Sequence, residues 1–242
     1  MNRSIAWLAL CQGLFLTNNV VFIAINGLVG LHLAPQPWMA TLPVMGYVVG
    51  GALSTPLVAR SQQRLGRQGS FQLGLLVALV SAAMCATAAY LQQFSLLCLS
   101  TLVAGYYSAN GQLYRFAAAE LVAPPQREKA ISLVLAGGLI GAVLGPALAS
   151  GTRTMFATPF LGAYLALMVV AVLSMAIMRL VRFAPANAQA GAAQLPQRSV
   201  GELLRQPGFA VATFCAAASY GVMNLLMAAT PLAMDVCGFD FS

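Results

Sequence analysis

Long uncharged stretches alternate with short basic ones along this chain. Seven stretches are dominated by Leu, Ala, Val and Gly, and each has the roughly 20 residues that a helix needs to cross a bilayer. Transmembrane strands are shorter and alternate polar with apolar positions, a pattern that these stretches lack. Because backbone groups in lipid must find partners within their own segment, the stretches are predicted to be helices. The predicted spans are Ile5–Val29, Trp38–Ala59, Phe71–Tyr90, Ser95–Ala119, Ala130–Ser150, Pro159–Met178 and Phe209–Ala229.

Composition supports a membrane protein. Only 7% of the 242 residues are charged, 60% are hydrophobic, and the mean hydropathy is +0.82. A soluble domain carries about 25% charged residues. We therefore predict an all-α polytopic membrane protein. The first span is too long and too polar for a cleaved signal peptide, since it contains Asn18, Asn19 and Asn26.

The basic residues predict the orientation. Of the 12 Lys and Arg residues, only Arg153 lies at the opposite ends of the spans and Arg115 lies inside the fourth, which leaves ten at the same ends. The positive-inside rule then places the N-terminus in the cytoplasm. The net charge of +7 is explained by topology, and no nucleic-acid partner is expected.

Catalytic and metal-binding chemistry is not indicated. The chain has one His and five acidic residues, and four of its five cysteines lie within spans at spacings unrelated to metal ligation. No HExxH, GxSxG or Walker pattern is present. We expect neither an enzyme nor a resident metal or cofactor.

The spans divide the chain into three parts. Six spans within residues 1–181 form a predicted N-terminal bundle, and residues 182–206 are polar enough to be a cytoplasmic linker. Residues 207–242 carry the seventh span, which is predicted to begin an incomplete second bundle. Six helices, a linker and one further helix suggest a truncated protein.

Amides near the middle of three spans are candidates for solute binding. Asn19, Asn110 and Asn224 lie near the centres of the first, fourth and seventh spans, where polar side chains are costly and usually face a cavity or a partner. Aromatic rings beside amides suit a small, partly apolar organic molecule. The alternative is that the amides only bridge neighbouring helices. The aromatic residues that share these faces are Phe22, Tyr107, Tyr114 and Tyr220.

Arg115 has several possible roles. It lies about one turn from the cytoplasmic end of the fourth span, near Glu120. It is positioned to snorkel to the interface, to pair with Glu120 or a loop carbonyl, or to bind an anionic group of a substrate.

Small residues recur at a spacing of four in the fifth span. Gly137, Gly141 and Gly145 leave one helix face as bare backbone, and Pro146 removes a backbone donor and favours a bend. This face either packs permanently inside one bundle or forms a surface that slides against a second bundle.

Two motifs resemble the major facilitator superfamily. Residues 64–67 (Arg-Leu-Gly-Arg) are similar to the GxLaDRxGR(K/R) signature between helices two and three, although Ala59 and Gln63 replace its first Gly and its Asp. The missing Asp normally helps to latch the two halves of such proteins. Gly141, Gly145 and Pro146 resemble the gxxxGPxxGG pattern of drug-efflux antiporters.

Several positions of the chain depart from the family's patterns. The closing glycines of the fifth-helix pattern are Ala149 and Ser150 here, and Ser100 and Thr101 stand where a proton-coupling Arg is expected. The family implies twelve helices in two halves, with helices one, four, seven and ten around a central cavity. This chain fits the first half, the linker and the seventh helix.

The resemblance implies proton-coupled efflux of a small organic solute by alternating access, in a bacterial cytoplasmic (inner) membrane. Its partners are then the solute, protons, the lipid bilayer, and a C-terminal half or another half-transporter. No span carries a mid-membrane acid, so either a proton carrier is Glu120 or lies in the missing half, or proton coupling is absent. The alternative is a truncated or partner-requiring half with no transport activity alone. Six residues are assigned to conformational change: Arg64, Gly66, Arg67, Gly141, Gly145 and Pro146.

Overall fold

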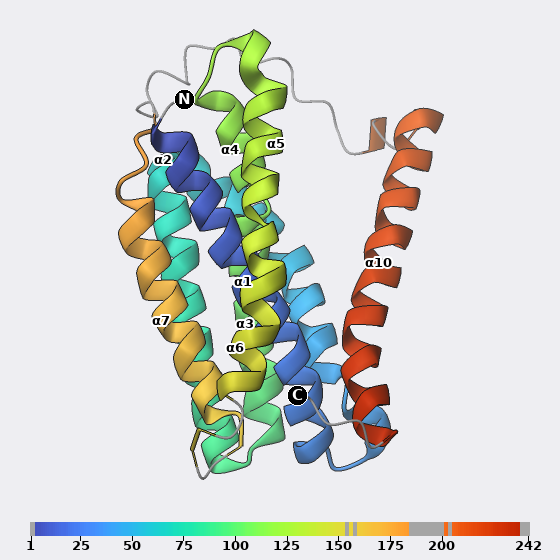
Figure 1. The fold of residues 1–242 in the computed structure, drawn as a ribbon. Coiled ribbons are helices and arrows are strands. Elements are labelled where there is room, and N and C mark those ends of the chain that lie inside the picture. Colours follow the sequence, from blue (N-terminus) through green and yellow to red (C-terminus); the bar gives the residue numbers. More distant parts are fainter. Residues whose placement is uncertain (1–2, 153–154, 157–158, 184–200, 203–204, 238–242) are drawn as a thin grey trace.

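The computed structural model describes residues 3–152, 155–156, 159–183, 201–202 and 205–237. Every element in these ranges is a helix, which confirms the all-α prediction (Figure 1). The elements are α1 (Arg3–Leu33), η1 (Pro37–Met39), α2 (Leu42–Leu91), α3 (Phe94–Gly111), α4 (Tyr114–Glu120), η2 (Pro124–Gln126), α5 (Arg127–Gly137), α6 (Leu139–Thr152), α7 (Leu161–Met178) and α10 (Pro207–Val236).

Five helical stretches of the described chain are long and apolar enough to cross a membrane. The predicted number of seven and the predicted orientation stay predictions. The predicted linker, 182–206, falls mostly outside the described residues. The five stretches are Arg3–Leu33, Pro37–Leu91, Pro124–Thr152, Leu161–Met178 and Pro207–Met227.

Helix α2 is a hairpin of two helical limbs. As one straight rod, its 50 residues would extend roughly 75 Å, far beyond a hydrocarbon core of about 30 Å. Gly66 interrupts it with φ 70° and ψ 178°, a conformation that suits only glycine. The hydroxyls of Ser61 and Ser70 then lie 2.6 Å apart, so the chain has reversed its direction. The segment 60–70, which lies between the second and third predicted spans, is helical on both sides of this single residue.

Two predicted helices are interrupted. The fourth predicted span divides into α3 and α4 around Gln112 and Leu113. The fifth divides into α5 and α6 at Gly138, where short i→i+3 bonds to Leu135 and from Gly141 tighten the backbone. Pro146 lies inside α6, which continues on both sides of it, and the bend predicted there stays a prediction.

Helix α1 occupies the centre of the bundle. It contacts α5, α6, α7 and α10 (Figure 1), and most of its side chains are buried. Bare backbone lets α5 and α6 approach it closely. A Cβ added to Gly141 would come within 2.6 Å of the Thr17 backbone nitrogen, and one added to Gly137 would overlap the Ala9 carbonyl. The glycine face of the fifth predicted span therefore packs against α1 of the same bundle in this conformation.

Glycines also let α2 and α3 approach each other closely. Gly50 and Gly105 face each other across this contact, and a Cβ on either glycine would overlap the backbone of the other helix. Gly51 is the neighbouring position in sequence, and a Cβ there would meet only the Gly105 carbonyl at 3.6 Å, an ordinary van der Waals distance.

We expect Gly50→Ala to destabilise the protein, because the added methyl group must push α3 away from α2. Overpacking of this kind costs about 1–3 kcal/mol. The measurement is the midpoint of thermal unfolding of the purified protein in detergent. Gly51→Ala is the matched control, and equal midpoints for the two variants would contradict the close α2–α3 contact.

Candidate solute-binding site

The amides of α1 differ in how their hydrogen bonds are satisfied. Asn26 donates from Nδ2 to the Phe22 carbonyl at 2.7 Å, and its Oδ1 accepts from the Tyr164 hydroxyl at 2.9 Å. It therefore bridges α1 and α7 as a structural residue. Asn19, two turns earlier, is also buried, but its Oδ1 has no hydrogen-bond partner among the described residues.

Aromatic side chains of α1 and α2 meet about one turn beyond Asn19. Phe22 follows Asn19 by about one turn, and its ring lies 4.9 Å from the ring of Tyr47 on α2 at 42°. Tyr47 is 3% exposed, and its hydroxyl has no partner with hydrogen-bond geometry among the described residues. Ser108 and Tyr220 lie close to it, so α3 and α10 also reach this part of the bundle.

Helix α10 carries a second buried amide, Asn224. Nδ2 of Asn224 donates to the Tyr220 carbonyl at 2.8 Å, one turn earlier, which fixes the amide and leaves Oδ1 as the remaining acceptor. That oxygen is buried and has no partner within the described chain. Asn224 is 8% exposed, whereas Tyr220 is 39% exposed. We call Asn19, Phe22, Tyr47, Tyr220 and Asn224 the amide–tyrosine site.

The site combines rings with orphaned polar atoms. Leaving a buried acceptor unpaired costs about 1–3 kcal/mol, so such atoms need an explanation. Asn19 Oδ1 and Asn224 Oδ1 are two such atoms, and Tyr47 Oη, which lies close to Ser108, also lacks a partner with hydrogen-bond geometry. Asn19 is one turn from Phe22, whose ring meets Tyr47, and Asn224 is one turn from Tyr220. A ligand that carries N–H or O–H donors and a flat apolar face would satisfy the oxygens and pack against the rings.

Tyr107 and Tyr114 pack in a second aromatic cluster, and Tyr107 also lies close to Tyr47. Phe15 contacts Tyr107 and Tyr114 edge-on, with centroids 5.4 Å and 5.9 Å apart, and Phe71 meets Tyr114 at 4.8 Å and 87°. Both tyrosines are buried in the hydrophobic core. Gly111 makes room for this packing, because a Cβ there would overlap the Phe15 ring. A binding role for Tyr107 and Tyr114 stays a prediction.

Asn110 and Arg115 make contacts with other residues of the bundle. Asn110 Nδ2 donates to the Ser70 carbonyl at 2.7 Å and so connects α3 to the second limb of α2, while its Oδ1 is an unpaired buried acceptor within the described chain. Arg115 lies with its guanidinium carbon 5.0 Å from the Phe116 ring centroid. Glu120, one of the partners considered for Arg115, forms an ion pair with Arg67.

The residues assigned to conformational change lie on two surfaces. Arg67 donates from Nε to Glu120 Oε2 at 3.0 Å, which joins the α2 hairpin to the end of α4. Gly66 forms the hairpin, and Arg64 lines a pocket of about 570 Å³ beside it. Gly145 packs against Val20 of α1, one helical turn beyond the Gly141 contact. Their part in gating, and that of Pro146, stays a prediction.

The sequence did not identify Tyr47. Amides near the middle of a span are the signal that predicts a polar span. The second span has no amide near its middle, so the sequence does not mark its tyrosine as a site residue. The detectable signal was a lone tyrosine between Gly46 and Gly50, on a span whose small residues indicate close packing.

Comparison with known proteins agrees with this architecture. The profile of the Major Facilitator Superfamily matches residues 7–242, and the chain belongs to this family of multi-pass membrane transporters, which are not enzymes. It is 34% identical over 233 residues to the riboflavin transporter RfnT of Brucella anthropi, covering 96% of this chain and 58% of that protein. The chain thus spans little more than half the length of this relative.

Two Bacillus subtilis proteins are also similar. The uncharacterised MFS-type transporter YddS is 29% identical over 124 residues, covering 51% of this chain and 28% of that protein. The uncharacterised MFS-type transporter YdeG is 29% identical over 126 residues, covering 52% and 29%.

The different bonding of Asn26 and Asn19 predicts different effects on stability. Asn26→Leu removes both of its hydrogen bonds and strands the Tyr164 hydroxyl, so we expect a loss of about 1–2 kcal/mol. Asn19→Leu removes an unpaired oxygen and is expected to leave stability unchanged or slightly increased. Thermal unfolding of both variants in detergent checks this.

A second substitution tests the hydrogen bond between Tyr164 and Asn26 that joins α7 to α1. Adding Tyr164→Phe to Asn26→Leu removes the stranded hydroxyl, so the double variant is expected to be no less stable than Asn26→Leu alone. Equal destabilisation by Asn19→Leu and Asn26→Leu would show that both amides are structural.

Proposed function

We propose that this chain is part of a transporter that moves a planar aromatic solute of the riboflavin type across the membrane by alternating access. The similarity to RfnT, which extends over 96% of the chain, supports the solute class. The relative is longer, so we propose that a second half, in the same protein or in another chain, completes the pathway.

The observation that carries the proposal is the set of unpaired oxygens beside aromatic rings in the amide–tyrosine site. Riboflavin offers a flat ring system for stacking, and its imide N–H and ribityl hydroxyls are donors. Phe22, Tyr47 and Tyr220 supply rings, while the Oδ1 atoms of Asn19 and Asn224 supply acceptors. Rings give contact area, and a few placed polar groups give orientation.

The site lies between the two parts that alternating access would move. Asn19 and Phe22 belong to the N-terminal bundle, whereas Tyr220 and Asn224 belong to α10, the helix that follows the predicted linker. A solute held between them would couple to any change in their separation. We propose that Arg64, Gly66 and Arg67 at the hairpin, and Gly141, Gly145 and Pro146 on α6, accommodate this movement.

The direction and coupling that we propose are efflux driven by protons across a bacterial cytoplasmic membrane. The resemblance of the glycine pattern in α6 to that of antiporters supports efflux. Glu120, the acidic residue that ends α4, is a candidate proton carrier together with groups in the second half.

Substitutions in the site are expected to reduce transport without loss of protein. Asn19→Leu and Asn224→Leu each remove an acceptor, and the loss of about 1.5 kcal/mol corresponds to a roughly tenfold decrease in riboflavin binding. The measurements are quenching of flavin fluorescence by the purified full-length protein and flux in proteoliposomes. Gln93→Leu, an exposed amide at the start of α3, is the matched control. Unchanged flavin binding in both site variants would overturn the assignment of the site.

The coupling proposal has its own test. Inverted membrane vesicles that carry the full-length protein are expected to accumulate riboflavin when energised, and a protonophore is expected to abolish this accumulation. Accumulation that survives collapse of the proton gradient would refute proton coupling. Uptake only in right-side-out vesicles would refute efflux while leaving the solute class intact.

A further inference from the structure

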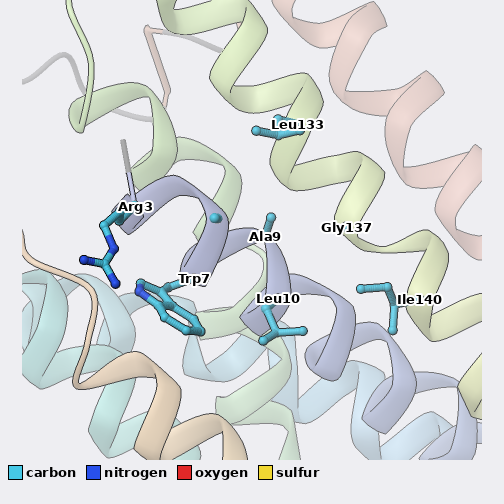
Figure 2. Close-up of a pocket in the computed structure, with 8 residues that line it drawn as sticks. Arg3, Trp7, Ala9, Leu10, Leu133, Gly137 and Ile140 are labelled. Carbon is cyan, nitrogen blue, oxygen red and sulfur yellow. The ribbon is translucent and has the colours of Figure 1, made fainter. Parts of the chain in front are cut away.

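An open apolar groove lies beside the first two turns of α1. It has a volume of about 480 Å³ and is lined by α1 together with α5 and α6. Figure 2 shows Leu133 and Ile140 projecting from the two later helices, and Arg3, Trp7 and Leu10 projecting from α1. Apart from Arg3 and the indole nitrogen of Trp7, the side chains that line the groove are hydrocarbon.

The groove is separate from the amide–tyrosine site. Nine residues separate Leu10 from Asn19, which is about two and a half helical turns and places them on opposite faces of α1. Arg3 and Gln12, a further amide of α1, are also nine residues apart and so lie on opposite faces of the helix. The groove therefore lies on the face of α1 that points away from the amides, toward the outside of the bundle.

One cation lies at the mouth of this groove. Arg3 begins α1, is exposed, and has no carboxylate within ion-pair distance among the described residues. One turn deeper, Trp7 combines an apolar ring with an N–H donor, the arrangement that favours the boundary between headgroups and acyl chains. The order along the groove is thus a positive charge, an amphipathic ring, and then hydrocarbon.

We propose that this groove binds an anionic phospholipid, with its phosphate on Arg3 and one acyl chain against Ala6, Leu10, Leu133 and Ile140. The sequence of chemistry along the groove matches that of the lipid from headgroup to tail. A free phosphate would use Arg3 alone and leave the apolar lining without a partner. A zwitterionic lipid would fill the apolar part but would gain less from the unpaired guanidinium.

Native mass spectrometry of the full-length protein in detergent tests the proposal. The protein is incubated with equimolar phosphatidylglycerol and phosphatidylcholine of identical acyl chains. We expect one phosphatidylglycerol to be retained preferentially. Arg3→Gln should reduce its retention about fivefold, the effect of one basic side chain at a lipid surface. Arg179→Gln is the control, because it removes an exposed positive charge outside the groove.

Two further measurements distinguish the lipid from other occupants. Millimolar inorganic phosphate is expected not to displace the lipid, and Ala6→Trp, which fills the groove, is expected to lower retention of both lipids. Equal retention of the two lipids, equal behaviour of Arg3→Gln and Arg179→Gln, or displacement by phosphate would overturn the proposal. So would a photocrosslinker at Leu133 that captures polypeptide rather than lipid in native membranes. Arg3→Gln alters an exposed side chain, so the test does not depend on Ala6→Trp folding.

Discussion

Close contact between helix backbones at glycines is the constraint on which this bundle depends. In lipid, apolar side chains gain little by leaving one apolar surrounding for another, so helices associate where small residues let their backbones meet. Gly50 and Gly105 provide this contact between α2 and α3, and Gly137 and Gly141 provide it between α5, α6 and α1. These contacts fix α1 at the centre of the bundle and hold Asn19 and Phe22 where side chains of α2 and α10 can reach them.

The fold was largely predictable because its strongest signals are local. Uniform apolar stretches predicted helices, and a spacing of four between glycines predicted close helix faces. The helix breaks were not predictable, because they depend on packing between distant segments. Gln112 and Leu113 carry no obvious break signal, yet α3 ends there as the Phe15 ring packs on Gly111. Pro146 carries the clearest local signal for a break, yet α6 continues on both sides of it.

The candidate site was predictable only in part. Sequence position shows that an amide is deep in a span, but it does not show whether another helix brings a partner to it. Asn26 meets the Tyr164 hydroxyl, 138 residues away, and becomes structural. Asn19 lies on the same helix with an unpaired oxygen, about one turn before Phe22. The Phe22 ring meets Tyr47, whose contribution depends on the packing of α2 against α1. The difference between structural and functional amides therefore arises from tertiary contacts.

The hairpin in α2 also bears on how the bundle would move. Helix continues to both sides of Gly66, and the Ser61–Ser70 contact ties the two limbs together close to the turn. A long flexible connection would let one limb twist while the other stayed still, but a single glycine between two stiff rods leaves almost no slack. Any rotation of the first limb is passed on as torque to the second and, through the Arg67–Glu120 ion pair, to the end of α4. The second and third predicted spans and the end of the fourth are therefore mechanically coupled at this end of the bundle.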